Sequence, residues 1–224
     1  MSQRAQPRVL VVAKVPVHGR VKTRLGRAIG MDQAARLAAA SLRDTIRACR
    51  DGYSVDRCHL ALDGDLAHAV AGAGLDALLD GWTVFPQRGT GLAERLVNAH
   101  LDVASRGTGP VLQIGMDTPQ VTARLLDDAA QGLEQSDAVL GMALDGGWWI
   151  LGMRDSTRVI PIRDVAVSTS STGEETRQVL ERDGLVVAAT GVLQDVDTVE
   201  DADAVAELAP HSDFARTWLW LRPP

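Results

Sequence analysis

Lys14 and Lys22 are the two lysines of a chain that otherwise carries its positive charge on 21 arginines. They lie eight residues apart, directly after the apolar run at residues 9–13, where Pro16 and Gly19 favour a loop. Such a loop can bind a di- or triphosphate through backbone N–H groups and several cations. It has neither the Walker A spacing nor the dinucleotide-binding glycine pattern, so a solvated basic loop remains the alternative.

Three carboxylates follow predicted strands. Asp117 lies in the sequence GMDTP at 115–119, and Asp195 and Asp197 alternate in the sequence QDVDT. Carboxylates in such positions suit Mg²⁺ or Mn²⁺, which also takes oxygens from substrate phosphates. Alternate residues of an extended segment face the same way, so Asp195 and Asp197 can converge on one cation. The structural alternatives are a turn at Asp117 and a helix cap in the second segment.

The sequence DGGWW, which begins at Asp145, is a further candidate. Gly146 and Gly147 permit a ligand to approach the backbone closely. Trp148 and Trp149 offer either an aromatic wall for a ligand or core packing. Taken alone, the same string also fits a hairpin turn between two strands.

Several other function classes find no support. The five histidines form no HExxH motif, which disfavours zinc catalysis, and no G-x-S-x-G motif supports a serine hydrolase. The net charge of −6 disfavours a nucleic-acid partner. The first fifty residues nevertheless carry eleven basic and two acidic side chains, which predicts a local anion site.

The elements that must position these residues alternate between strand and helix. Short apolar runs predict buried strands, and apolar residues at helical spacing predict the helices between them. The predicted strands are 9–13, 58–62, 83–85, 111–114, 138–140, 148–151 and 185–189. The predicted helices are 32–50 with Asp32 as N-cap, 66–71, 92–105, a helix ending near 133 with Thr122 as N-cap, 174–182 and, as the last, 199–208. This order indicates an α/β sheet with helices on both faces, which binds ligands at the carboxyl ends of its strands.

Length and composition predict one domain over residues 1–224, with 46% hydrophobic and 23% charged residues. No apolar run reaches the roughly 18 residues of a membrane span, and the first seven residues lack the apolar region of a signal peptide. We therefore expect a cytoplasmic protein with reduced thiols; a Cys49–Cys58 disulfide is the alternative. The apolar stretch at 218–221 is expected to pack on the domain, with a homodimer contact as the alternative.

The strings AKVPVHGRVKTRL, GMDTP, DGGWWILG and DVDT, in this order, resemble the DUF2064 family, whose members are also described as selenodomain-associated transferase 1. The resemblance extends over residues 9–208. A more distant similarity links the lysine loop, the Asp117 turn and DVDT to 2-phospholactate guanylyltransferases. The resemblance implies a three-layer α/β/α fold with a mixed, mostly parallel sheet, which is the nucleotide-diphospho-sugar transferase (GT-A) fold.

The resemblance also implies how the site is divided. Nucleotide phosphates would lie over the lysine loop, Mg²⁺ or Mn²⁺ would be held by Asp117 and a late carboxylate, and the Asp145 motif would lie on the acceptor or sugar side. Asp197 is preferred to Asp195 as the late ligand. The implied catalytic residues are Lys22, Asp117 and Asp145; nucleotide-binding residues are Ala13, Lys14, Gly19, Lys22, Thr23 and Arg24; substrate-binding residues are Gly146, Gly147 and Trp148; metal ligands are Asp117 and Asp197.

From the residues and the resemblance together, we expect a metal-dependent transferase that moves a glycosyl group from a nucleotide-diphospho-sugar to a small-molecule acceptor. Nucleotidyl transfer of the guanylyltransferase type, with release of pyrophosphate, is the alternative within this class. A nucleotide-binding module without catalysis is a third possibility. It is motivated by Val167 and by Trp148–Trp149, where the family commonly has Trp and Tyr.

Overall fold

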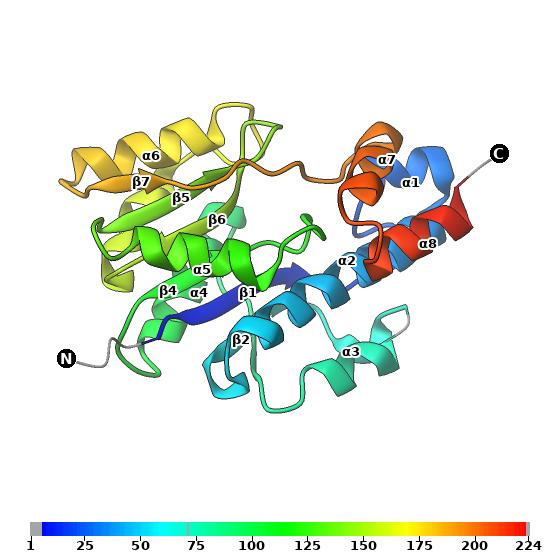
Figure 1. Ribbon diagram of the computed structural model, residues 1–224, viewed down its shortest axis with the longest axis horizontal. Coiled ribbons are helices and arrows are strands. Elements are labelled where there is room, and N and C mark those ends of the chain that lie inside the picture. Colours follow the sequence, from blue (N-terminus) through cyan, green and yellow to red (C-terminus); the bar gives the residue numbers. More distant parts are fainter. Residues whose placement is uncertain (1–5, 71, 223–224) are drawn as a thin grey trace.

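The computed structural model describes residues 6–70 and 72–222, and its strands form one seven-stranded sheet (Figure 1). The strands are β1 (Arg8–Lys14), β2 (Cys58–Asp63), β3 (Thr83–Pro86), β4 (Val111–Ile114), β5 (Ala138–Met142), β6 (Trp148–Met153) and β7 (Val187–Ala189). Their order in the sheet is β3-β2-β1-β4-β6-β5-β7. Neighbouring strands are parallel except that β6 runs antiparallel to both β4 and β5. The predicted mixed, mostly parallel sheet is confirmed.

Helices cover both faces of this sheet, which gives three layers. The helices are α1 (Thr23–Ile29), α2 (Met31–Gly52), α3 (Gly72–Leu78), α4 (Leu92–Ala104), α5 (Ala123–Gly132), α6 (Thr172–Arg182), α7 (Val199–Leu208) and α8 (Asp213–Leu221), with 3₁₀ turns η1 (Val55–Arg57), η2 (Leu66–His68) and η3 (Ser156–Asp164). The buried side chains of α2 and α5 pack on one face, and those of α4, η3 and α6 pack on the other. None of the helices within the described residues is long and apolar enough to cross a membrane.

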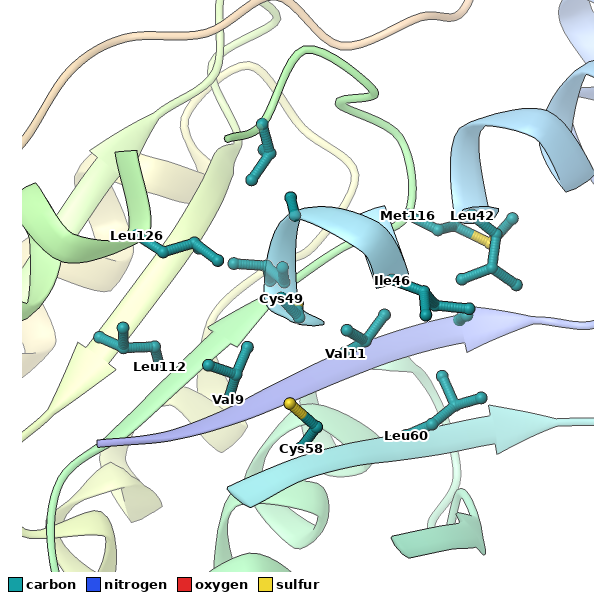
Figure 2. Packing of buried hydrophobic residues seen from close by; sticks show 14 of the residues in the cluster. Val9, Val11, Leu42, Ile46, Cys49, Cys58, Leu60, Leu112, Met116 and Leu126 are labelled. Atoms are coloured by element: carbon teal, nitrogen blue, oxygen red, sulfur yellow. The ribbon is translucent and has the colours of Figure 1, made fainter. Parts of the chain in front are cut away.

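The continuous apolar run of β1 is explained by this coverage. Successive strand residues face opposite sides, so Val9 and Val11 pack against α2 while Leu10 and Val12 pack toward α4. Figure 2 shows the α2 side, where Val11 lies near Ile46 and Val9 lies below Cys49. Cys49 and Cys58, also drawn in Figure 2, are both buried and free, as expected.

The start of the second helix differs from the prediction. α2 begins at Met31, and its N-cap is Gly30, which has a φ of 97°. The prediction of Asp32 as the N-cap was wrong: Asp32 lies in the first turn, and its Oδ1 is 2.8 Å from Nδ1 of His18. The positive φ of Gly30 allows α1, which was not predicted, to end directly before α2 begins.

Two other helical predictions need correction. The described part of the predicted helix at 66–71 is only the 3₁₀ turn η2, and Ala71 lies outside the described residues. α7 is confirmed at 199–208, but it is not the last helix, because α8 follows it. The predicted packing of the C-terminal stretch is confirmed for Trp218, which is buried and donates from Nε1 to Asp203 Oδ1 at 2.9 Å, whereas Trp220 is exposed.

His100 in α4 makes the stability of the protein sensitive to acid. Its imidazole is fully buried, and neither ring nitrogen has a hydrogen-bond partner in residues 6–70 and 72–222. Burial lowers its pKa from 6.5 to about 3. As the pH falls below 6.5, the unfolded chain binds a proton at this position that the folded protein excludes. Stability is therefore lost between pH 6.5 and about 3.

We expect His100→Leu to remove this contribution, which amounts to about 1.4 kcal/mol per pH unit below the unfolded pKa. Urea unfolding at several pH values between neutral pH and pH 5 measures how steeply the free energy of unfolding falls with pH. His68→Leu, at an exposed histidine, is the matched control and should keep the wild-type slope. Equal slopes for His100→Leu and the wild type would contradict the prediction.

Candidate functional site

The sheet topology brings the sequence motifs to one edge. β1 and β4 are parallel and end at Lys14 and Ile114, so the lysine loop and the Asp117 turn leave the sheet together. β6 is antiparallel, so Trp148, at its start, lies at this same edge. The segment between β7 and α7 crosses the molecule in Figure 1 and reaches the same edge of the sheet. There the Val196 N–H donates a hydrogen bond to the Asp117 carbonyl at 3.2 Å.

Two adjoining cavities lie at this edge. The basic cavity, of about 640 Å³, is lined by five cationic side chains: Lys14, Arg20, Lys22, Arg24 and Arg95. The acidic cavity, of about 500 Å³, is lined by four carboxylates: Asp117, Asp145, Asp195 and Asp197. Arg24, Asp117, Ser168 and Asp197 line both cavities and form part of the boundary between them.

Lys22 lies at this boundary and is held in a defined position. Its backbone has a φ of 47° in the left-handed region and begins α1, and only 2% of its side chain is exposed. Nζ lies 2.5 Å from Oδ1 of Asp117 and also donates to the carbonyl of Val196. Its ammonium therefore connects the turn after β4 to the segment before α7.

Two carboxylates of the site, Asp195 and Asp197, are destabilised as anions by burial and by neighbouring carboxylates. Burial raises the pKa of Asp197, and Asp117 raises it further, against the opposing effect of Lys22. Burial, followed by Asp145 and Asp197, raises the pKa of Asp195 to about 6. Arg24 Nη1, at 3.0 Å from Asp197 Oδ2, supplies a second local counter-charge.

The donor set at the boundary fits a divalent cation of the Mg²⁺ type. Asp117 and Asp197 both remain accessible, with 56% and 40% of their side chains exposed. Within residues 6–70 and 72–222, no group of three or more His, Cys, Asp or Glu side chains is placed to hold a metal. Mg²⁺ commonly binds through one or two carboxylates and takes its other ligands from phosphates and water. The two aspartates fit that kind of site.

The Asp145 motif forms a tight turn that supports the acidic cavity. Asp145 Oδ1 accepts a hydrogen bond from the Gly147 N–H at 2.8 Å, and Gly146 has a φ of 89°. The Gly146 carbonyl accepts from the Gly173 N–H at 2.8 Å, and a Cβ at Gly146 would overlap the Ser170 backbone. Glycine is therefore required at 146 by both conformation and space.

The two tryptophans of this motif have different surroundings. Trp149 is 2% exposed and donates from Nε1 to the Gly191 carbonyl at 2.7 Å, so it is mainly a core residue. Trp148 is half-buried, and both tryptophans line the acidic cavity. Of the two interpretations open from the sequence, core packing describes Trp149, and an aromatic wall remains available at Trp148.

The structure brings together most of the residues singled out from the sequence. Lining the basic cavity are Ala13, Lys14, Lys22, Thr23, Arg24, Asp117 and Asp197; lining the acidic cavity are Asp117, Asp145, Gly147, Trp148, Asp195 and Asp197. Gly19 and Gly146 line neither cavity, although Gly146 shapes the turn. The functional roles of all these residues remain predictions.

Other lining residues were not identified from the sequence. Arg95 enters the basic cavity from α4, where Nη1 is 2.9 Å from Oδ2 of Asp63. Gln113 and Ser168 line the acidic cavity from β4 and from the loop before α6. Arg95 lies on a helix and Gln113 inside a strand, so neither had a sequence signal. Ser168, which has a φ of 62°, directly follows Val167, where the chain departs from the family pattern.

The profile of one protein family matches residues 44–169, which is more than half of the chain. The chain belongs to the DUF2064 family. The family is described as an uncharacterized protein conserved in bacteria. A comparison of this DUF2064 chain with curated proteins found no match.

Solved structures share the fold of the DUF2064 chain. A protein from Desulfovibrio desulfuricans G20, named provisionally as a nucleotide-diphospho-sugar transferase, is 28% identical, with a TM-score of 0.81 over 97% of this chain and 95% of that chain. Rv0371c from Mycobacterium tuberculosis H37Rv, in complex with manganese, is 22% identical, with a TM-score of 0.51 over 90% and 99% of the two chains. CMP:2-keto-3-deoxy-manno-octonic acid synthetase, complexed with CTP, is 13% identical, with a TM-score of 0.58 over 92% and 99%. The predicted nucleotide-diphospho-sugar transferase fold is therefore confirmed.

Proposed function

We propose that this DUF2064 protein is a metal-dependent transferase that moves a glycosyl group from a nucleotide-diphospho-sugar to a small-molecule acceptor. The observation that carries the proposal is the adjacency of the two cavities. Five cations line a space suited to phosphates, and the carboxylates of Asp117 and Asp197 lie at the boundary with a second space suited to the acceptor. The relative from Desulfovibrio desulfuricans, by its provisional name, supports the same donor class.

The chain's own residues can provide most of the electrostatic stabilisation. Lys14, Lys22 and Arg24 would neutralise the donor diphosphate as negative charge develops on its leaving oxygen. A divalent cation on Asp117 and Asp197 would supply further charge neutralisation at the diphosphate. Asp145, whose Oδ1 is already engaged by the Gly147 N–H, would orient the acceptor hydroxyl or accept its proton. The acceptor oxygen bonds to the anomeric carbon, the carbon–diphosphate bond breaks, and a nucleoside diphosphate leaves.

Nucleotidyl transfer is the second candidate, because five cations can also bind a triphosphate. In that reaction the acceptor oxygen attacks the α-phosphorus of a nucleoside triphosphate, and pyrophosphate leaves. Product analysis separates the two reactions, since the first releases a nucleoside diphosphate. Nucleotide binding without any product would instead favour a non-catalytic module.

We expect nucleotides to stabilise the protein in a metal-dependent manner. A ligand at about one hundred times its dissociation constant adds about 2.7 kcal/mol. Thermal unfolding with UDP-glucose, GDP-mannose, GTP and UTP, each with and without Mn²⁺ or Mg²⁺, measures this effect. In Asp117→Asn, the part of the shift that depends on metal should disappear.

Asp128→Asn is the matched control, because Asp128 is exposed on α5 and lines neither cavity. It should retain the full wild-type response. If no nucleotide shifts the unfolding of the folded wild type, the proposed donor site is wrong. If Asp117→Asn responds to metal as the wild type does, Asp117 is not a metal ligand.

A further inference from the structure

The acidic cavity contains two carboxylates that lack a basic partner. Asp117 pairs with Lys22, and Asp197 pairs with Arg24. In the part of the chain that the structure describes, neither Asp145 nor Asp195 forms an ion pair with a basic side chain. Asp145 and Asp195 also lie close enough to repel each other. A cation between them would relieve that repulsion.

Buried polar side chains in the wall of the same cavity point independently to a ligand. Gln113 is fully buried in β4, and its Oε1 has no hydrogen-bond partner among the described residues. Thr118 is 3% exposed, and within the same residues its Oγ1 also has no partner. A buried polar atom without a partner costs free energy, and a ligand with hydroxyl groups in the cavity that both residues line would supply the missing partners.

We propose that the acidic cavity is the acceptor subsite and that it selects a cationic hydroxyl compound, such as an amino sugar or an amino alcohol. This inference rests on the proposed transferase function. The ammonium would bind Asp195 in the cavity that Trp148 also lines, while Oδ2 of Asp145 stays available for the reacting hydroxyl. Hydroxyl groups elsewhere on the acceptor would meet Gln113 and Thr118.

The same charges disfavour an anionic acceptor. Four carboxylates line the acidic cavity, and Arg24, its one cationic lining residue among those described, is already paired with Asp197. With a divalent cation held by Asp117 and Asp197, Asp145 and Asp195 would still form no ion pair, and Lys22 would offset part of the charge of Asp195. An acceptor carboxylate or phosphate would therefore bind against like charge, which disfavours it strongly in a partly desolvated site.

Three sugars with the same pyranose ring test this selection: glucosamine, glucose and glucuronate. Their affinities for the nucleotide-loaded protein can be measured by titration calorimetry. We expect glucosamine to bind at least about tenfold more tightly than glucose, and glucuronate to bind most weakly. Asp195→Asn should abolish the preference for the amine, whereas Gln113→Leu should lower the affinities for all three sugars by the same factor. Asp128→Asn should behave as the wild type.

Equal affinities, a preference for glucuronate, or no binding of glucosamine at its highest soluble concentration would each overturn the inference. So would loss of the amine preference when Mn²⁺ alone is added, because the metal would then occupy the Asp145–Asp195 pair. Nucleotide-induced thermal shifts on the same samples test the proposed transferase function separately from the acceptor assignment. If the shift is absent, the proposed function fails; if it is present without amine selection, only the acceptor assignment fails.

Discussion

Lys22→Met is expected to lower kcat by about two to three orders of magnitude in a protein that stays folded, comparable to the loss of one preorganised oxyanion donor. Nζ of Lys22 is nearly inaccessible, lies 2.5 Å from Oδ1 of Asp117, and faces the cavity assigned to phosphates. Methionine keeps much of the length and apolar packing of the stem but removes the charge. The variant therefore loses stabilisation of the leaving diphosphate, and most of the effect should fall on kcat rather than on the fold.

Release of nucleoside diphosphate or pyrophosphate measures this loss, and thermal unfolding checks that the variant is folded. Arg27→Met is the matched control: Arg27 is an exposed cation on α1, the helix that Lys22 begins, and it lines neither cavity. Its turnover should be unchanged. Wild-type kcat in Lys22→Met would remove this lysine from the proposed mechanism.

Gly146→Ala is expected to destabilise the protein by about 2–5 kcal/mol, from a left-handed backbone that alanine resists and from steric overlap. The φ of Gly146 is 89°, and an added Cβ would overlap the Ser170 backbone. The turn and the loop before α6 would have to separate, which would also widen the acidic cavity. Urea unfolding measures the stability, and acceptor affinity reports the distortion.

Gly191→Ala provides the control. Gly191 has open space around its Cα, and its carbonyl, which accepts from Trp149, would be kept in the variant. We expect its stability to change by no more than about 0.5 kcal/mol. A Gly146→Ala protein as stable as Gly191→Ala would show that the turn tolerates a side chain.

The sequence predicted the sheet well because a buried strand leaves a local signal. β1 is covered on both faces, so it reads as an uninterrupted apolar stretch, and β4, which is buried throughout, is apolar except for Gln113. α1 was missed because its N-cap, Lys22, makes no side-chain cap and its seven residues carry little periodicity. α8 did have a signal, since the Ser212 side chain accepts from the Ala215 N–H, but its apolar residues were read as a tail.

The candidate site was predictable where its residues lie at strand ends or in short motifs that combine glycine with charged residues or alternate carboxylates. Lys14 and Asp117 are of that kind, and the topology of parallel strands places both at one edge. Arg95 reaches the site from a helix, and Gln113 lies inside a strand, so neither differs in sequence from an ordinary surface or core position. The pairing of Lys22 with Asp117 depends on segments 95 residues apart, and no local pattern encodes it.

The reversed direction of β6 makes the two halves of the site modular. The walls unique to the basic cavity come largely from the loops after β1 and β3, whereas those unique to the acidic cavity come largely from the β5–β6 hairpin and the loop before α6. A hairpin can change in length without moving the parallel strands beside it. Exchanging residues 143–149 together with 167–172 between relatives should therefore transfer the acceptor specificity of one protein to the other, while nucleotide binding in the basic cavity stays unchanged.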